Sequence, residues 1–326
     1  MKRRVCLCAA LAMLPVVTQA QPAGRQSRVA VLSGSTPDAN VRRNMVEPFN
    51  RGLRELGYVD GHNIRIDYRW SEGRPDRLPG LLAELLQLQP DVLVTSGPRP
   101  SELAKSATRS IPIVALAVND PVLTGLAESL ARPGGNITGI SSWGGELVAR
   151  RLQLLKDLVP SVRRYAVLTN PITASSGELT TFLAGYARTM GVDIRLYEAS
   201  EPGAFEPVFA AMERDQVGAV LVLADATFYL HRARLAELCT SRRLPSVWGG
   251  REYLEGGGLA SFQSDFAAIF HRGAALVDKI LKGAKAGEMP FERASKLELV
   301  VNRKAARALG ITVPAAVLVA ADEVIE

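Results

Sequence analysis

The stretch Arg28-Val29-Ala30-Val31-Leu32-Ser33 constrains the fold most, because the chain repeats it as Arg164-Tyr165-Ala166-Val167-Leu168-Thr169. Each copy is followed by a polar loop, a stretch with helical periodicity and a second β-like run, at residues 64–68 and 194–197. Third and fourth apolar runs follow at residues 91–95 and 111–114 in the first half and at 219–223 and 244–247 in the second. Short, solidly apolar strands that alternate with helices are typical of βαβ units whose sheets are covered on both faces. The repeat therefore predicts an α/β fold of two doubly wound parallel-sheet domains with the same topology.

The loops after these strands contain the candidate ligand-binding residues, because doubly wound sheets bind ligands beyond the carboxyl ends of their strands. Two facing domains would then form one cleft. Hydroxyl and backbone N–H groups at helix starts suit a carboxylate, since the helix dipole and the unpaired donors favour negative charge. An ammonium would instead need an ionised carboxylate such as Asp120 or Asp225, and the ring of Trp248 or Tyr253 could cover a flat ligand face. The candidates in these loops are Ser33, Gly34, Ser35, Ser96, Gly97, Arg99, Asp120, Asn170, Asp225, Thr227 and Trp248.

Several candidates also have a purely structural interpretation. Asp120 stands before a proline, as a helix N-cap often does, and the spacing after it predicts a helix that runs to about Ala131. The serines could act only as helix caps, and Asn170 could belong to a simple turn. Trp248 follows a buried strand, where a core residue is also expected. The sequence alone leaves both interpretations open.

The first 20 residues have the features of a signal peptide. Lys2-Arg3-Arg4 is a positive start, an apolar stretch follows from Val5 to Val17, and Thr18-Gln19-Ala20 places a small residue at the cleavage edge. A membrane anchor would need about 20 apolar residues, and this stretch is shorter. Cys6 and Cys8 lie inside the stretch and not at its end, so a lipid-anchored cysteine is not expected. We predict export, cleavage after Ala20, and a soluble periplasmic protein with no direct membrane insertion.

The composition is typical of a soluble globular chain. With 326 residues and 47% hydrophobic content, the chain has enough apolar side chains for two cores. The formal net charge of +6 includes three leader cations, and the basic residues form no stripe of the kind that binds nucleic acid. Cys239 lies at helical spacing from Leu235 and Leu238, which indicates a buried small hydrophobe. The three histidines lack a metal-ligand spacing, and we expect neither a metal nor a cofactor.

A set of motifs resembles one known family. The set consists of Asp120-Pro121-Val122, Gly125-Leu126 and the segment SLARPGGNITG at residues 129–139, with residues 52–58 and 68–70 before it and residues 277–284 and 321–326 after it. In this order and spacing, the motifs resemble the signature of ABC-transporter substrate-binding proteins that include tryptophan and tyrosine binders. The resemblance covers nearly the whole mature chain. It implies a type I periplasmic-binding fold, with two lobes joined by several hinge strands.

The resemblance also implies that the second lobe is interrupted. Residues 259–263 would cross to the first lobe, which then receives a helix from about Asp265 to Lys282, and residues 297–301 would cross back. Glycine-containing breaks precede both crossings and would let the lobes close on a ligand. The expected boundaries are residues 28–139 plus 262–290 for lobe 1, and residues 140–261 plus 291–326 for lobe 2.

The function that the resemblance implies is capture of a small molecule, an amino acid or related carboxylate, and its delivery to an ABC permease in the inner membrane. Two places depart from the family pattern: Arg99 stands where a small residue is usual after the third strand, and Ser261-Phe262-Gln263 stands where tyrosine and glycine are frequent. Ser261 therefore joins the candidate ligand-binding residues. A ligand-sensing module for a receptor would share the same cleft, and an exported α/β enzyme is the third alternative. The sequence lacks G-x-G-x-x-G, a phosphate loop and a G-x-S-x-G elbow, so no enzyme activity is expected.

Overall fold

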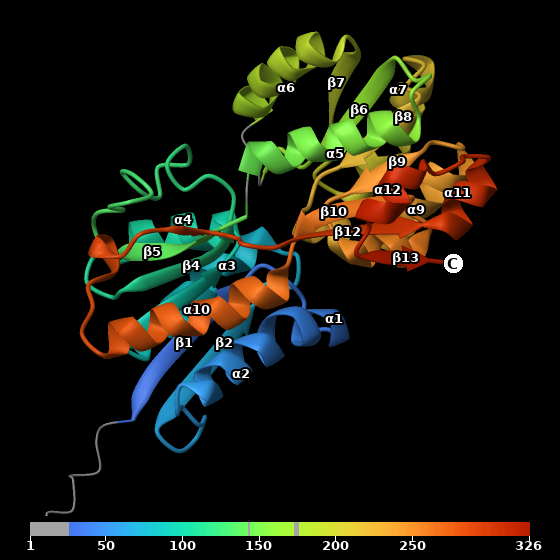
Figure 1. Cartoon of the computed structure of the whole chain (residues 1–326). Helices are drawn as coiled ribbons and strands as arrows, with labels where there is room; N and C mark the ends of the chain where they lie inside the picture. The colour runs from blue at the N-terminus through green and yellow to red at the C-terminus, as the bar shows by residue number, and fades with distance from the viewer. Residues whose placement is uncertain (1–25, 143, 173–175) are drawn as a thin grey trace, which may run out of the picture.

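Two α/β lobes of similar design make up the protein. A computed structural model describes residues 26–142, 144–172 and 176–326, which form two sheets flanked by helices (Figure 1). The lobe that contains β1 lies at the lower left of Figure 1, and the lobe that contains β6 lies at the upper right. The predicted signal peptide, residues 1–20, lies outside the described residues.

Lobe 1 is built on a six-stranded parallel sheet. Its strands are β1 (Ser27–Ser33), β2 (Ile64–Trp70), β3 (Val92–Ser96), β4 (Ile113–Val118), β5 (Ile137–Ser141) and β11 (Glu292–Arg293). They lie in the order β11-β5-β4-β3-β1-β2, and every neighbouring pair is parallel.

Lobe 2 is built on a seven-stranded sheet. Its strands are β6 (Arg164–Thr169), β7 (Asp193–Glu198), β8 (Ala219–Val222), β9 (Ser246–Trp248), β10 (Ala260–Ser264), β12 (Leu297–Asn302) and β13 (Glu323–Ile325). They lie in the order β13-β12-β10-β9-β8-β6-β7, and the pair of β10 with β12 is antiparallel. The order β9-β8-β6-β7 repeats the order β4-β3-β1-β2 of lobe 1. The predicted fold of two parallel-sheet lobes with like topology is therefore confirmed.

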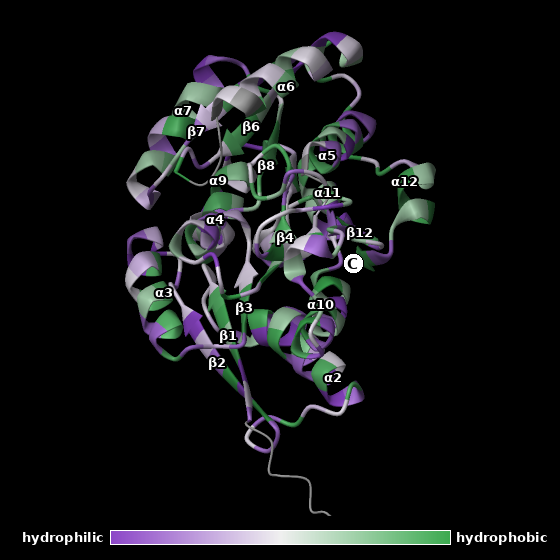
Figure 2. Cartoon of the chain, turned by 90° about the vertical axis from the view of Figure 1, so that its left-hand side faces the viewer, coloured by the Kyte–Doolittle hydropathy of each residue, from purple (hydrophilic) through white to green (hydrophobic). Residues whose placement is uncertain are grey.

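Helices cover both faces of the lobe 1 sheet. On one face, α1 (Ala39–Val41), a π-helical turn (Arg42–Val46) and α2 (Glu47–Glu55) pack together with α10 (Phe266–Leu281). On the other face lie α3 (Leu78–Gln87) and α4 (Pro98–Ala107). Successive side chains of β1 enter the two cores in turn, as the alternation of a strand requires. Figure 2 shows the largely apolar strands β1 and β3 of this sheet, and helices such as α3 and α2 that carry both polar and apolar residues.

The lobe 2 sheet is covered in the same way. One core is shared by α5 (Gly144–Leu158), α6 (Ser176–Met190), α11 (Arg303–Leu309) and α12 (Ala315–Ala320), and the opposite core by α7 (Phe205–Arg214), α8 (Ala226–Leu230) and α9 (Arg232–Ser241). Short 3₁₀ helices lie at Pro75–Arg77, Pro202–Ala204, Arg251–Gly256 and Ala286–Glu288. Cys239 is buried in the second of these cores as predicted, and burial raises the pKa of its thiol to about 12.

Three segments connect the lobes. The chain leaves lobe 1 after β5, returns after β10 to add α10 to lobe 1, and crosses again between β11 and β12 (Figure 1). The predicted crossover strands therefore correspond to β10 and β12, and the predicted helix between them to α10. α10 packs closely on α2, where a Cβ on Gly52 would lie 2.6 Å from the carbonyl oxygen of His271. Only glycine permits this approach.

The segment after β4 corrects one prediction. Residues 121–125 form turns, not the start of a helix that runs to about Ala131. Gly125 has a φ of +68°, and Lys105 Nζ donates to the carbonyls of Gly125 (2.6 Å) and Leu126 (3.0 Å). Leu126 is buried in the core of lobe 1. Burial of this side chain and capture of the carbonyls by a lysine have overridden the helical spacing.

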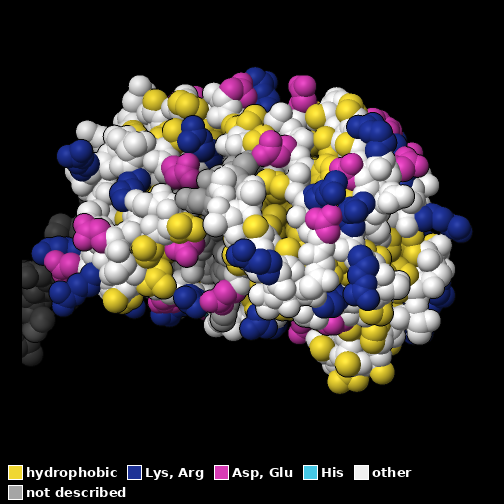
Figure 3. All heavy atoms as spheres, turned by 90° about the horizontal axis from the view of Figure 1, so that it is seen from above, with side chains coloured by type: hydrophobic (Ala, Val, Ile, Leu, Met, Phe, Trp, Pro, Cys, Tyr) yellow, Lys and Arg dark blue, Asp and Glu magenta, His cyan; other side chains and the backbone are white. Residues whose placement is uncertain are grey.

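The charges on the surface are mixed. On the face seen in Figure 3, lysine and arginine side chains are interspersed with aspartate and glutamate. Within the part of the chain that the structure describes, no helix is long and apolar enough to cross a membrane. The same residues contain no group of three or more His, Cys, Asp or Glu side chains that could hold a metal ion.

Candidate functional site

The cleft between the lobes lies at the carboxyl ends of the parallel strands. β5 and β10 run parallel to their neighbours β4 and β9, and the chain crosses to the other lobe directly after each of them. The loops that follow the other parallel strands therefore face the opposite lobe. This is the edge at which doubly wound sheets bind ligands.

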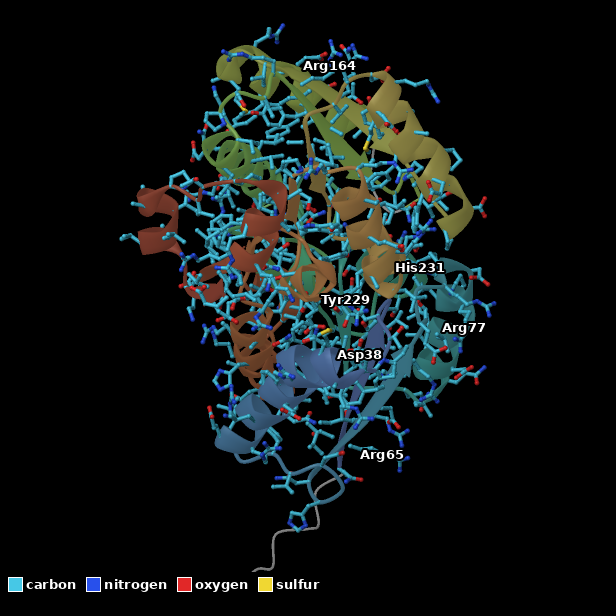
Figure 4. The ribbon with its side chains drawn as sticks, turned by 90° about the vertical axis from the view of Figure 1, so that its right-hand side faces the viewer. Asp38, Arg65, Arg77, Arg164, Tyr229 and His231 are labelled. Carbon is cyan, nitrogen blue, oxygen red and sulfur yellow. The ribbon has the colours of Figure 1, made fainter. Side chains whose placement is uncertain are left out.

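A hydrogen bond joins the two lobes across this cleft. The hydroxyl of Tyr229, on α8 of lobe 2, donates to Asp38 Oδ2 of lobe 1 at 2.6 Å (Figure 4). Asp38 Oδ1 caps α1 by accepting from the backbone N–H groups of Asn40 (3.0 Å) and Val41 (2.9 Å). The guanidinium of Arg232 lies 4.5 Å from the centre of the Tyr229 ring. One carboxylate thus caps a helix in lobe 1 and accepts a hydrogen bond from lobe 2.

The pKa values of both partners move in the directions that strengthen this bond. Burial favours the neutral form of Asp38, but the hydrogen bonds from Tyr229 and from two backbone N–H groups outweigh burial and hold the pKa of Asp38 below its ordinary 3.8. Burial and the hydrogen bond to Asp38 raise the pKa of Tyr229 above its ordinary 10.0. At neutral pH the pair is therefore a phenol that donates to a carboxylate, which is a charge-assisted hydrogen bond.

Further contacts cross the cleft beside this bond. Asn44 Nδ2 lies 3.5 Å from Glu252 Oε1 of lobe 2, and burial raises the pKa of that carboxyl. A Cβ on Gly73 of lobe 1 would lie 3.5 Å from Leu230 Cδ2 of lobe 2. The lobes are thus closed against each other along this side of the cleft.

A pocket of about 210 Å³ lies between the lobes, next to the crossover strands. From lobe 1 it is lined by Asn40, Arg43 and Asn44 and by the start of α10 at Phe266 and Ala267. Arg251, Gln263, Asp265 and Glu298 line it from the loop after β9, the end of β10 and β12. None of these residues was among the sequence candidates.

Two of the four charged residues of this pocket are already paired. Arg251 forms a bidentate ion pair with Glu323 of β13, with an Nε to Oε2 distance of 3.0 Å and an Nη2 to Oε1 distance of 2.6 Å. Asp265 caps α10 at the N–H of Ala268 (2.9 Å) and lies 3.5 Å from Lys296 Nζ. These side chains shape the pocket, and their charges are neutralised within the protein.

The candidates after β1 lie at the cleft edge of lobe 1 and bond to one another. Ser33 is fully buried, and its Oγ accepts from the backbone N–H of Ser35 at 3.2 Å. The carbonyl of Gly34 accepts from Ser71 Oγ at 3.2 Å. The hydroxyl of Ser33 therefore stabilises the turn in which Gly34 and Ser35 lie.

The candidates after β3 form a helix start. Gly97 has a φ of +87° and is the N-cap of α4, directly after Ser96. Ser101 Oγ donates to the Gly97 carbonyl (2.7 Å) and lies 2.8 Å from Thr95 Oγ1. Arg99 is exposed on the first turn of α4 and pairs with Glu102 at 3.3 Å. Its guanidinium points along the helix surface.

Asp120 and Asp225 both cap the segments that follow their strands. Asp120 is exposed, and its Oδ1 accepts from the backbone N–H groups of Val122 and Leu123, both at 3.0 Å. Asp225 Oδ1 accepts from the N–H groups of Thr227 (2.8 Å) and Phe228 (3.2 Å) at the start of α8. The structure thus supports the interpretation of Asp120 as a cap, but the segment that it caps is a turn and not the predicted helix.

The structure brings Asn170 and Asp225 together and places two other lobe 2 candidates in the interior. Asn170 Nδ2 donates to Asp225 Oδ1 at 3.2 Å. Trp248 is fully buried, where it stacks on Tyr253 with ring centres 5.0 Å apart. This corrects its assignment as a cover for a ligand, because the ring belongs to the core of lobe 2. Ser261 is also fully buried, and its Oγ has no hydrogen-bond partner.

Sequence reasoning also missed Arg151, on α5. Its side chain is buried, Nε donates to the carbonyl of Phe262 at 2.5 Å, and Nη2 lies 3.4 Å from the carbonyl of Gly249. Burial lowers the pKa of this guanidinium to about 10. Arg151 therefore ties α5 to β10 and to the loop after β9. No sequence motif marks it, because arginine pairs are frequent on solvated helix faces.

Two lobes of like topology joined by three segments define the class of type I periplasmic binding proteins. The sequence matches the ABC transporter substrate binding protein family over residues 30–325, and the chain belongs to this family. The motifs at residues 120–139 had predicted this membership. The function of the family, and hence of this chain, is that of the substrate-binding component of an ABC transporter.

Known proteins give more detail. A tyrosine-binding protein of Clostridioides difficile is 25% identical over 269 residues, which cover 80% of this chain and 75% of that protein. An ABC domain from Streptococcus pneumoniae in complex with L-Trp is 27% identical, with a TM-score of 0.84 over 92% of this chain and 100% of that one. A conserved domain protein from Vibrio cholerae is 28% identical, with the same TM-score and coverage. A leucine binding protein from Thermotoga maritima, 13% identical with a TM-score of 0.61, covers 78% of this chain and 83% of its own, and shows the fold alone.

Proposed function

We propose that this protein captures a free amino acid or a related carboxylate in the interlobe cleft and delivers it to an ABC permease in the inner membrane. The observation that carries the proposal is the family match over residues 30–325. The tyrosine-binding and L-Trp-bound relatives support the ligand class. The hydrogen bond between Asp38 and Tyr229 supports capture by closure, because it can form only when the lobes meet.

The proposed ligand-binding residues remain those of the cleft loops. They are Ser33, Gly34, Ser35, Ser96, Gly97, Arg99, Asp120, Asn170, Asp225 and Thr227, together with Ser261. Residues 28–139 plus 262–290 would move as lobe 1 on opening, and residues 140–261 plus 291–326 as lobe 2. Hinge closure of this kind needs rotations in only a few connecting residues.

Export is part of the same proposal. The leader would be cleaved after Ala20, so that the periplasmic protein begins at Gln21 and has no membrane insertion of its own. N-terminal sequencing of periplasmic material tests this. Protein that still begins at Met1 would contradict it.

A thermal-shift screen tests the binding function. It would use the twenty L-amino acids, small carboxylates and aromatic metabolites. A ligand at a hundred times its Kd should stabilise the protein by about 2.7 kcal/mol. Absence of stabilisation by every compound would overturn the proposed ligand class.

We also propose that binding occurs without turnover, so that the ligand is recovered unchanged. A chemically altered product whose formation stops after heat denaturation would indicate an enzyme.

A further inference from the structure

The interlobe pocket contains two charged side chains that form no ion pair with another described residue. Arg43 is exposed and enters the pocket from lobe 1, and Glu298 is half-buried on β12 of lobe 2. The other charged residues of the pocket, Arg251 and Asp265, pair with Glu323 and Lys296. The pocket therefore offers, on opposite lobes, one positive and one negative side chain without an ion-pair contact, and the charge of nearby Arg251 attracts Glu298.

Gln263 adds an unfilled acceptor beside the negative charge. It is 5% exposed, and its Nε2 donates to Glu298 Oε2 at 2.9 Å. This bond fixes the amide so that Oε1 is left as an acceptor, and Oε1 has no donor in the structure. A buried acceptor without a partner costs about 1–3 kcal/mol, so a group that supplies a donor here would be bound favourably.

We propose that this pocket binds the zwitterionic head group of a free amino acid, with its ammonium against Glu298 and Gln263 Oε1 and its carboxylate against Arg43. The inference rests on the proposed function and names the subsite for it. An ammonium brings three donors and no acceptor, which matches a carboxylate beside an empty amide oxygen. A guanidinium is the side chain best suited to a carboxylate.

The size of the pocket fits this assignment. Its volume of about 210 Å³ corresponds to roughly seven water molecules at about 30 Å³ each. That is ample for an amino-acid head group and below the range of about 300–1,000 Å³ that encloses a drug-sized ligand. A large side chain would then extend from the pocket along the cleft.

The position of the pocket would couple binding to closure. Arg43 belongs to lobe 1 and Glu298 lies on β12 of the lobe 2 sheet, whereas Gln263 lies at the end of β10, where the chain crosses between the lobes. A ligand that contacts both sides binds only the closed arrangement at full strength, and it shifts the population toward closure by that difference in affinity. The same closed arrangement contains the hydrogen bond between Asp38 and Tyr229.

The test compares ligand analogues with charge-removing variants. Each of the twenty L-amino acids is titrated singly by calorimetry, and any that binds is followed by its decarboxylated amine and its N-acetyl derivative. Arg43→Gln should weaken the amino acid by about tenfold or more while leaving the amine within about twofold. Glu298→Gln should weaken the amino acid and the amine by about tenfold or more, and should leave the N-acetyl derivative nearly unchanged.

Matched controls keep the test decisive. Arg42→Gln removes a neighbouring exposed charge that does not line the pocket, and it should bind like wild type. Arg43 is exposed, so Arg43→Gln should fold, and thermal unfolding without ligand checks this. If an amino acid binds wild type but Arg43→Gln and Glu298→Gln bind it equally well, the subsite is wrong and the proposed function stands. If no amino acid binds wild type, both proposals fail.

Discussion

Buried polar side chains are hydrogen-bonded at the cleft edge of lobe 1, whereas several on the crossover strand β10 have no hydrogen-bond partner. The hydroxyls of Ser33, Thr95 and Ser101 are fully buried, and each is hydrogen-bonded within its own loop. On β10, the buried Ser261 Oγ, Gln263 Oε1 and Ser264 Oγ have no hydrogen-bond partner. Unpaired buried polar atoms are costly and therefore often mark a function. The comparison shows that the loops of lobe 1 satisfy their own buried hydroxyls, while β10 leaves three buried polar atoms unpaired.

The internal repeat extends to the crossover strands. Five strands of each lobe have the same order, with β10 in the place of β5, and lobe 1 adds β11 whereas lobe 2 adds β12 and β13. The pocket is lined by β10 and β12, and β13 supplies the partner of Arg251. The repeated strands thus build the two lobes, and the pocket between them takes Gln263 from the crossover strand β10 and Glu298 from β12, which follows the repeat.

The largest expected effect tests how tightly the sheet of lobe 1 is packed. A Cβ on Gly139 of β5 would lie 1.8 Å from the carbonyl oxygen of Ala115, which is backbone of the neighbouring strand and cannot move aside. Gly139→Ala should lower the free energy of unfolding by more than about 4 kcal/mol. Gly185→Ala on α6 is the matched control, because a Cβ there meets nothing within 4 Å. Chemical denaturation should show it unchanged or about 0.5–1 kcal/mol more stable. Equal stability of the two variants would contradict the packing described.

The next effect concerns Arg151, which ties α5 to β10. Arg151→Ala leaves the carbonyls of Phe262 and Gly249 without their donor and creates a cavity, and both changes destabilise the fold. Removal of a buried, unpaired charge is favourable and offsets part of this destabilisation. We expect the free energy of unfolding to fall by about 2–4 kcal/mol. Arg150→Ala, one position away and exposed, should change it by about 0.5 kcal/mol or less. A similar loss in both variants would mean that the buried hydrogen bonds contribute nothing specific.

The interlobe bond predicts a smaller effect, on affinity more than on stability. Tyr229→Phe keeps the ring and removes the donor to Asp38, so closure loses one charge-assisted hydrogen bond of about 1.5–3 kcal/mol. Calorimetry should find the affinity of the captured ligand about tenfold lower or more. Val41 and Asn40 still donate to Asp38, so lobe 1 should unfold as before. An unchanged affinity would show that the bond does not contribute to closure.

The same bond predicts a pH window. The lowered pKa of Asp38 means that its contribution is present above its ordinary 3.8 and is lost as the pH falls through the lowered value. The raised pKa of Tyr229 means that its contribution is present below its ordinary 10.0 and is lost as the pH rises through the raised value. Between about pH 4 and 10, the difference in affinity between wild type and Tyr229→Phe should therefore stay constant. A difference that disappears near pH 7 would require another titrating group.

Much of the fold was predictable from the sequence because its strands are short and solidly apolar. Runs such as residues 28–33 and 164–169 became β1 and β6, and the predicted helix from about Asp265 to Lys282 became α10. The segment after Asp120 was not predictable in the same way. Helical spacing says nothing of Lys105, which lies elsewhere in the sequence and binds the carbonyls that a helix would use.

The site was less predictable than the fold. The strand ends indicated where the cleft lies, and the departure from the family pattern at residues 261–263 pointed to β10. Arg43 and Asn44 carried no signal, because they lie on a helical turn whose sequence resembles any solvated surface. The sequence left Trp248 open between core and ligand platform because aromatic rings suit both, and its full burial and its stacking on Tyr253 support the core.

The smallest expected effect concerns Asp120, at the cleft edge of lobe 1. Asp120 Oδ1 caps a turn by accepting two backbone N–H groups, and asparagine caps about as well as aspartate. Asp120→Asn should therefore change the free energy of unfolding by only a few tenths of a kcal/mol. If the carboxylate also attracts the ligand's ammonium, loss of its charge at this exposed position should cost at most about 1 kcal/mol of binding, because water screens exposed pairs. That is less than the loss expected for Glu298→Gln in the pocket.

Titration calorimetry of Asp120→Asn and Glu298→Gln with the same ligand measures this difference in affinity directly. Equal affinities of Asp120→Asn and wild type would leave Asp120 with its capping role alone, whereas a loss larger than that of Glu298→Gln would move the ammonium subsite from the pocket to the edge of lobe 1.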